Sequence, residues 1–222
     1  IRGWDFFHED NAPLDDNMHG THVAGIAGAV GNNGIGIAGA AWNVKIMPIK
    51  SFQASGVGNS IDIAEGVEYA YSNGATIINM SFGAYAESFT LKLALENAYS
   101  TSILVAAAGN NFFCIGPTDD YCPQNVYIAP IFPGAYSFIL GVEDVNGDYD
   151  NFDYDGPIST GYNINKLFNY ELQAPGSAIM STVPNGGYAT LTGTSMATPL
   201  VAGAMALYNQ QKPEDSKELI FG

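Results

Sequence analysis

Apolar and polar positions divide the chain into two kinds of segment. Short continuous apolar runs are typical of strands buried on both faces of a sheet, and they alternate with segments whose apolar residues recur at a helical spacing. The strands predicted in this way cover residues 44–49, 76–80, 102–108 and 138–142. The helices predicted between them cover residues 60–71 and 89–98, and Asn73-Gly74 ends the first of these.

Two further helices are predicted near the ends of the chain, and both are rich in small residues. One opens around His19-Gly20-Thr21-His22, and the other follows Gly193-Thr194-Ser195. Strand–helix–strand repetition with short connections predicts an α/β fold in which helices cover both faces of a parallel sheet. The length of 222 residues suits one domain over residues 1–222, and no linker divides it.

The composition excludes several classes of function. The net charge is −15, with only seven Lys plus Arg, so nucleic acids and anionic membranes are poor partners. Solvation is the ordinary explanation of such an acidic surface, although it can also hold cations. No apolar run reaches the length of a membrane-spanning helix.

Two cysteines, Cys114 and Cys122, lie in a loop rich in Asp, Pro and Tyr. Their spacing matches no common zinc pattern. One interpretation is a disulfide that closes a small surface loop, which would imply an oxidising, extracytoplasmic compartment. The other is a pair of free thiols.

Three polar side chains stand where a parallel sheet places its chemistry, at strand ends or helix starts. His19 opens a helix and could act as a base, Asn110 ends a strand and could donate to an oxyanion, and Ser195 could be a nucleophile. Each alone has a structural explanation. Ser195 could be an N-cap, His19 could form a structural pair with His22, and Asn110 could cap a turn. The three together in this order favour catalysis.

The residues around these three positions resemble the signature blocks of the subtilisin family of serine proteases. The matching blocks are His19-Gly20-Thr21-His22-Val23-Ala24-Gly25, Ala108-Gly109-Asn110 and Gly193-Thr194-Ser195-Met196-Ala197-Thr198-Pro199. The resemblance implies a subtilisin-like three-layer fold, with a mostly parallel sheet between helices. It also implies that Ser195 is the nucleophile, His19 the general base and acid, and Asn110 an oxyanion-hole donor beside the Ser195 backbone N–H.

The resemblance further implies where an extended substrate binds. Ser81, Phe82 and Gly83 would pair with the substrate backbone on one side, and Gly56, Val57 and Gly58 on the other. Phe82 and the Ala107-Ala108-Gly109 segment would line the pocket for the residue before the scissile bond, although core packing explains Phe82 equally well. Phe132-Pro133 falls where relatives have a structural cis proline.

The sequence departs from the family pattern most clearly at the third member of the triad. The family's Asp lies in an Asp-Thr-Gly or Asp-Ser-Gly turn upstream of the region matching Gly3-Trp4-Asp5-Phe6, and neither turn occurs in this sequence. Asp15 and Asp16 belong to the polar loop before His19, and neither is assigned to this role. The segment could be a separate chain after nicking, could be unresolved, or could have been lost. Met18 and Leu200 replace a frequent glycine and a frequent histidine.

Structural calcium is a further expectation, because hard oxygen ligands suit that ion. Asp5 and Asp10 resemble part of a calcium loop in some thermostable relatives, and Asn33 resembles part of the family's strong site. A solvated acidic loop explains the first equally well, and the second would be incomplete without upstream residues. No cofactor is needed for the chemistry itself.

The sequence therefore predicts a secreted or cell-surface serine endopeptidase that acts on proteins or peptides through an acyl-enzyme on Ser195. The expected partners are the substrate, the missing N-terminal segment or a propeptide, and a larger extracellular or cell-surface assembly. One alternative is an impaired pseudoprotease that serves as a binding or structural subunit. Another is an esterase that uses Ser195 and His19.

Overall fold

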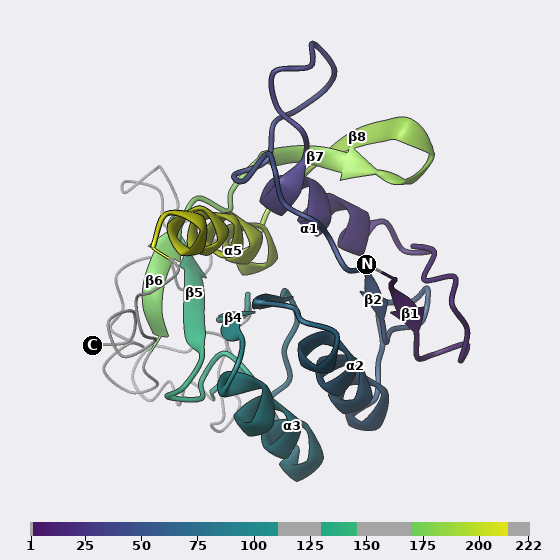
Figure 1. Cartoon of the computed structure of the whole chain (residues 1–222), viewed down its shortest axis with the longest axis vertical. Coiled ribbons are helices and arrows are strands. Elements are labelled where there is room, and N and C mark those ends of the chain that lie inside the picture. Colours follow the sequence, from purple (N-terminus) through teal and green to yellow (C-terminus); the bar gives the residue numbers. More distant parts are fainter. Residues whose placement is uncertain (1, 111–129, 146–169, 213–222) are drawn as a thin grey trace, which may run out of the picture.

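The computed structural model describes residues 2–110, 130–145 and 170–212, which form three layers around a parallel sheet (Figure 1). The helices are α1 (His19–Gly28), α2 (Ser60–Ser72), α3 (Phe89–Tyr99) and α5 (Thr194–Gln211), with a 3₁₀ turn at Pro184–Gly186. The strands are β1 (Trp4–Asp5), β2 (Ile49–Lys50), β3 (Ile77–Met80), β4 (Ile103–Ala107), β5 (Leu140–Asp144), β6 (Tyr170–Ala174), β7 (Ile179–Val183) and β8 (Gly187–Leu191). The predicted α/β class is confirmed.

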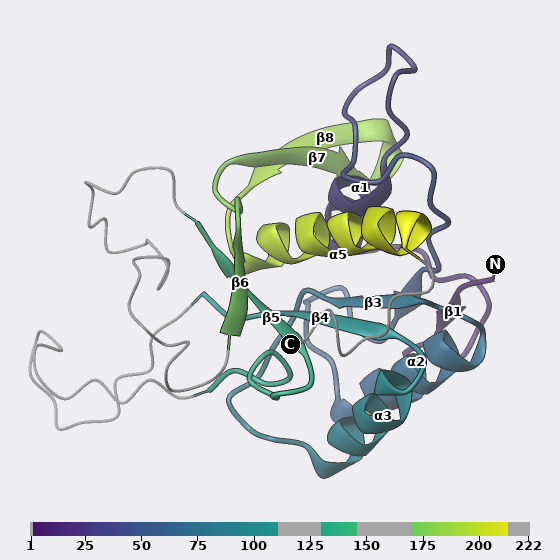
Figure 2. The ribbon, with the colours of Figure 1, turned by 60° about the vertical axis from the view of Figure 1, so that its left-hand side comes forward.

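The central sheet has the order β3-β4-β5-β6, and all its strands run parallel. Helices α2 and α3 lie on one side of this sheet and α5 lies on the other, with α1 beyond it beside the β7–β8 hairpin (Figure 2). Because strands β3 and β4 are covered on both faces, their sequences are apolar except at Asn79 and show no regular alternation. This is why the two strands were predictable from the sequence.

The two faces of the sheet have separate cores. Leu104 and Ala106 of β4 pack toward α2 and α3, whereas Ile103 and Val105 pack toward α5. Successive strand residues point to opposite faces, so this alternation fixes which side each residue of β4 serves. The carboxyl ends of β3 and β4 lie together beside the start of α5.

One predicted strand is much shorter than expected. Of residues 44–49, only Ile49 belongs to a strand, which continues to Lys50 and pairs in parallel with Trp4–Asp5. Pro48 has no N–H to donate to a ladder, although its carbonyl accepts from Trp4 N at 3.2 Å. The strand predicted over 138–142 lies at Leu140–Asp144 instead, because Phe138 stacks on Tyr136 in the turn before it.

Strands β2 and β3 are joined by α2 but are not hydrogen-bonded to each other in the described part of the chain. Helix α2 packs against both, and Met47 and Ile49 reach the same apolar core as Ile78. A strand–helix–strand crossover normally joins two parallel strands of one sheet. The arrangement therefore leaves the position between β2 and β3 without a strand among the described residues.

Of two local features expected from the sequence, the structure tests only one. Cys114 and Cys122 lie outside the described residues, so their pairing stays a prediction. The Phe132-Pro133 peptide bond is cis, as expected from the resemblance. Among the residues that the structure describes, no helix combines the length and apolarity that crossing a membrane requires.

Candidate active site

Ser195 stands in the first turn of α5, two residues after a glycine that no other residue could replace without strain. Gly193 has φ +147°, and a β-carbon there would lie 2.9 Å from Asn110 Nδ2. Thr194 N donates to Asn110 Oδ1, and Met196 and Ala197 N donate to Gly193 O. In the described structure the Ser195 N–H has no acceptor, so it is available to an anion beside the serine.

A proline inside α5 explains how Ser195 is fixed to the end of β3. Pro199 lacks the N–H that would normally bond to the carbonyl four residues earlier, which belongs to Ser195. The Ser81 hydroxyl donates to that carbonyl instead, at 3.0 Å. Ser195 Oγ in turn donates to Ser81 O at 3.2 Å. This reciprocal pair ties Ser195 to one of the segments expected to bind substrate.

The carboxamide of Asn110 is oriented by Thr194, the residue next to Ser195. Thr194 donates to Asn110 Oδ1 twice, from its backbone N at 2.8 Å and from its hydroxyl at 2.9 Å. Because both bonds go to the oxygen, the amide nitrogen of Asn110 is left to donate. The Thr194 hydroxyl also accepts from Gly109 N at 3.2 Å, so β4 and α5 share one hydrogen-bonded unit.

His19 is the first residue of α1, and the backbone before it is held in an unusual conformation. Met18 has φ +84°, in the left-handed region, where a side chain costs about 1 kcal/mol. Glycine avoids this cost, which accounts for the glycine that the resembling family usually has there. Asn17 Nδ2 donates to Ala54 O at 2.7 Å and fastens this helix start to the turn that contains Gly56.

The electrostatic surroundings keep the His19 imidazole neutral. Burial lowers its pKa below the ordinary value of 6.5, the nearby His22 lowers it further, and the charge of Asp15 opposes both effects. A neutral imidazole at pH 7 can accept a proton. Helix α1 packs against α5, but in the described residues no hydrogen bond joins His19 to Ser195.

Asp15 does not act as the orienting carboxylate for His19. Its oxygens accept from the backbone N–H groups of Asn17, Met18 and Thr21 and from the Thr21 hydroxyl. Burial raises the pKa of Asp15, but these hydrogen bonds outweigh burial and hold it below 3.8. Asp15 therefore organises the start of α1, as expected for the polar loop before His19.

The second histidine of the motif anchors α1 on its outer side. His22 is fully buried, and its Nε2 lies 3.0 Å from the Ala189 carbonyl of the hairpin. Ser181 Oγ donates to His22 O at 2.7 Å, and Thr182 Oγ1 donates to Thr21 O at 3.0 Å. The β7–β8 hairpin, which the sequence did not predict, thus holds the helix that carries His19.

The segments expected to bind substrate lie close to each other. Phe82 follows β3, and its ring centroid is 5.1 Å from that of Phe52, which bridges to Gly58. Val57 is exposed at the tip of the same turn. Phe82 is also packed against the core of α2 and α3, as one of the two interpretations of this residue predicts, and its role in a substrate pocket stays a prediction. Ala108 N donates to Val142 O, which fixes the end of β4.

The carboxylates expected to hold calcium are engaged by nitrogen donors. Asp5 is buried and accepts from Phe7 N, from His8 N and from His8 Nδ1, and Lys50 Nζ lies 3.5 Å from it. Asp10 Oδ1 accepts from Ala12 N. A calcium ion needs several oxygens to face it, and the Asp5 oxygens already face nitrogen donors, so calcium at Asp5 and Asp10 stays a prediction. Among the described residues no acidic or histidine cluster offers three metal ligands.

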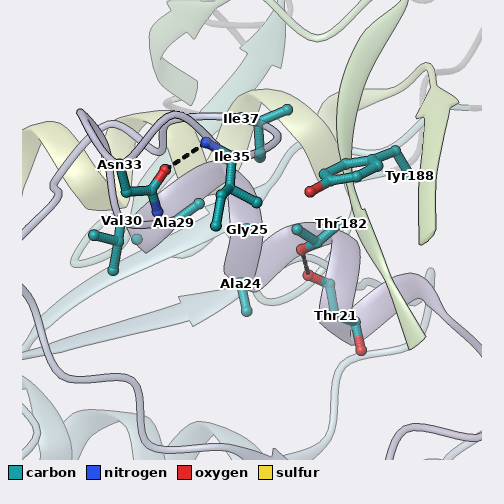
Figure 3. Close-up of a pocket in the computed structure, with 11 residues that line it drawn as sticks. Thr21, Ala24, Gly25, Ala29, Val30, Asn33, Ile35, Ile37, Thr182 and Tyr188 are labelled. Carbon is teal, nitrogen blue, oxygen red and sulfur yellow. Dashed lines mark hydrogen bonds between the residues drawn. The ribbon is translucent and has the colours of Figure 1, made fainter. Parts of the chain in front are cut away.

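Asn33 lies in an exposed loop beside a cavity of about 380 Å³ between α1 and the hairpin. Figure 3 shows that Asn33 and Ile35 line one end of this cavity, and Thr21, Thr182 and Tyr188 the other. Asn33 Oδ1 accepts from Ile35 N at 2.9 Å, so it stabilises its own loop. The cavity is lined by neither His19 nor Ser195, and a calcium ion at Asn33 stays a prediction.

Replacing Lys50 with methionine is expected to destabilise the fold by about 2 kcal/mol, because a buried carboxylate loses its cationic neighbour. Burial raises the pKa of Asp5, but the bonds from His8 and the charge of Lys50 hold it below 3.8. The stabilisation is therefore present above pH 3.8 and is lost as the pH falls through the lower folded value. Urea unfolding at pH 7 and pH 3 measures both effects. Lys45→Met, at an exposed position, is the matched control, and an equal loss in both variants would contradict the prediction.

The roles that two residues have in organising the site were not identified from the sequence, although Ser81 was expected to bind substrate. Thr194 orients the carboxamide of Asn110, and the Ser81 hydroxyl donates to the carbonyl oxygen of Ser195. The role of Ser81 has a signal in the sequence. Pro199, four residues after Ser195 in the same helix, implies that the Ser195 carbonyl oxygen needs a donor from outside the helix. The role of Thr194 depends on a contact between segments far apart in the chain.

Comparisons with known proteins identify the family and the fold of the chain. A model described as the subtilase family matches residues 1–220. Thermitase from Thermoactinomyces vulgaris is 38% identical over 214 residues, covering 95% of this chain and 68% of thermitase. A thermophilic serine proteinase from Bacillus sp. strain AK1 is 38% identical over 216 residues, and the match spans 47% of its length. The solved structure named sphericase aligns with a TM-score of 0.76 at 36% identity, covering 94% of this chain and 68% of that one.

Proposed function

The chain belongs to the subtilase family, and from this premise we propose that it is an endopeptidase that cleaves proteins through an acyl-enzyme on Ser195. The observation that carries the proposal is the unit formed by Asn110, Thr194 and Ser195. It presents a hydroxyl beside two N–H donors, the Asn110 amide and the Ser195 backbone, which is the arrangement that acyl transfer requires.

The proposed reaction follows from these groups. Ser195 Oγ attacks the substrate carbonyl while its proton passes to His19, and the carbonyl oxygen becomes an anion held by Asn110 and the Ser195 N–H. His19 then gives the proton to the amine as the C–N bond breaks. A water molecule, deprotonated by His19, attacks the ester, and Ser195 leaves with the returned proton. The hydroxyl must first leave Ser81 O and turn toward His19.

We further propose that the carboxylate orienting His19 comes from a strand that fills the position between β2 and β3. Parallel strands present their side chains to a site at their carboxyl ends, where Ser81 and Asn110 already lie. Asp15 and Asp16 are engaged elsewhere, Asp15 by four hydrogen bonds and Asp16 by Lys50. Without such a strand the protein would resemble the second candidate, a pseudoprotease that binds peptides without cleaving them.

A fluorophosphonate probe tests the proposed nucleophile directly. Attack by Ser195 Oγ forms an O–P bond and expels fluoride, and intact-protein mass spectrometry with peptide mapping locates the adduct. Labelling should increase as the pH rises through a value below 6.5, because His19 must be neutral to accept the proton.

The controls are Ser195→Ala, which should abolish labelling, and Ser100→Ala at an exposed position, which should leave it unchanged. Absence of labelling in the intact native protein would rule out the peptidase. Comparison of ester and amide substrates distinguishes an esterase, since only a peptidase cleaves both at useful rates.

The cellular setting is also a proposal. We propose secretion or display at the cell surface, with proteins or peptides as substrates and an N-terminal segment or propeptide as partner. The support is the family membership together with the net charge of −15, which suits a soluble surface. Calcium at Asn33 would be structural, with no part in the chemistry at Ser195.

A further inference from the structure

The segment that contains Gly83 and the segment that ends in Gly109, both of which the resemblance places beside the substrate, are separated by a third side chain. Gly83 lies on one side and Gly109 on the other, and Ile131 lies between them. A β-carbon at Gly83 would overlap Ile131 Cγ2, and one at Gly109 would lie 2.7 Å from Ile131 Cγ1. The space between Gly83 and Gly109, which have no side chains of their own, is therefore filled by the side chain of Ile131.

Ile131 is held firmly in this position. The next residue, Phe132, exchanges two backbone hydrogen bonds with Ala84, each 2.8 Å long, which sets residues 131–132 beside the segment that contains Gly83. Ala135 N donates to Ile131 O at 2.9 Å and closes the turn. The side chain is 8% exposed, and its β-branching leaves few rotamers.

We propose that Ile131 forms a raised floor in the pocket for the residue before the scissile bond, so that the protein selects alanine, serine or glycine at this position. The inference rests on the proposed function of Ser195 and names the substrate class for the same site. Phe82 does not provide this floor, because its ring is turned toward Phe52 and the core of α2 and α3.

The selection has a steric basis. A leucine or phenylalanine side chain entering between Gly83 and Gly109 would meet the buried isoleucine, which has no free volume on the side of either glycine. Overpacking of this kind costs about 1–3 kcal/mol, which corresponds to about 5- to 150-fold in rate. A small side chain ends above Ile131 and avoids the collision.

The test uses peptides that differ only in the residue before the scissile bond. The unmodified protein is expected to give kcat/KM about 10-fold or more higher with alanine than with phenylalanine. The Ile131→Ala variant should raise the ratio of phenylalanine to alanine about 100-fold, and Ile131→Val should raise it by less. Ile103→Ala removes the same atoms from the core between the sheet and α5 and should keep the ratio of the unmodified protein.

A binding measurement separates this inference from the proposed function. Product peptides ending in alanine or phenylalanine are titrated into the Ser195→Ala variant and into Ser195→Ala combined with Ile131→Ala. Preference for the alanine peptide that disappears in the double variant supports the inference even if the protein cleaves nothing. Equal or better binding or cleavage with phenylalanine in the unmodified protein overturns it, whether or not Ser195 is a nucleophile. If Ile131→Ala does not fold, the profile of the unmodified protein still decides.

Discussion

Filling the position between β2 and β3 with a strand that ends in aspartate is expected to raise the peptidase rate of residues 1–222 by about 10⁴-fold. The magnitude is that of removing the carboxylate from a serine protease triad, including that of subtilisin. An aspartate beside His19 would hold the imidazole in the correct tautomer and stabilise its cation. No group in the described structure does so, because Asp15 is engaged at the start of α1.

The experiment joins an extended apolar segment of about six residues, ending in Asp-Thr-Gly, ahead of residue 1 through a glycine-rich linker. The matched control carries asparagine in place of the aspartate, which fills the same space without the charge. Hydrolysis of a peptide anilide measures the rate, and hydrogen exchange of β2 and β3 reports whether the strand has entered. Equal rates for the two segments, with protection of both strands, would refute the role given to the carboxylate.

Replacing Asn110 with alanine is expected to lower kcat by about 10²–10³ with little change in KM. The magnitude is the one known for the corresponding donor in subtilisin. The reason is that Thr194 holds the amide oxygen with two hydrogen bonds, which leaves the amide nitrogen to donate to the proposed oxyanion. The ground-state carbonyl gains little from this donor, so substrate affinity changes little.

The rate of phosphonylation and the hydrolysis of a peptide anilide both measure the effect. Asn43→Ala, at an exposed position away from the site, is the control for a general effect of removing a carboxamide. Thr194→Val should weaken catalysis by less, because the backbone N–H of residue 194 still holds the oxygen. A rise in KM with unchanged kcat in Asn110→Ala would instead assign Asn110 to substrate binding.

The strands that could be predicted from the sequence are those that are buried on both faces of the sheet. Ile77–Met80 and Ile103–Ala107 are covered on both faces, so their apolar runs are unmistakable. Strand β6 and the β7–β8 hairpin were missed because they mix polar and apolar residues, as in Tyr170–Ala174. Residues 44–48 look like a strand but lack a paired neighbour among the described residues.

The residues of the candidate site also fall into those that could be predicted from the sequence and those that could not. His19, Asn110 and Ser195 stand in local motifs that can be recognised one at a time, and the structure gathers Asn110, Ser195 and Ser81. Thr194 and Ile131 have no such signal. Their roles depend on which segments meet in space, and Ile131 reaches Gly83 only through the pairing of Phe132 with Ala84.

The hydrogen bonds of Thr194 have a consequence for how such a protein loses activity. Ser195 and Asn110 are joined through the Thr194 side chain, whereas His19 is carried by α1, which packs against α5 and is also anchored by the Asn17–Ala54 contact and the β7–β8 hairpin. Heat or denaturant that loosens the hairpin would displace His19, while Asn110 and Ser195, which are proposed to bind a negatively charged ligand, kept their arrangement. Inactivation would then precede the loss of affinity for anionic transition-state mimics, and a tightly bound mimic would not by itself indicate a working enzyme.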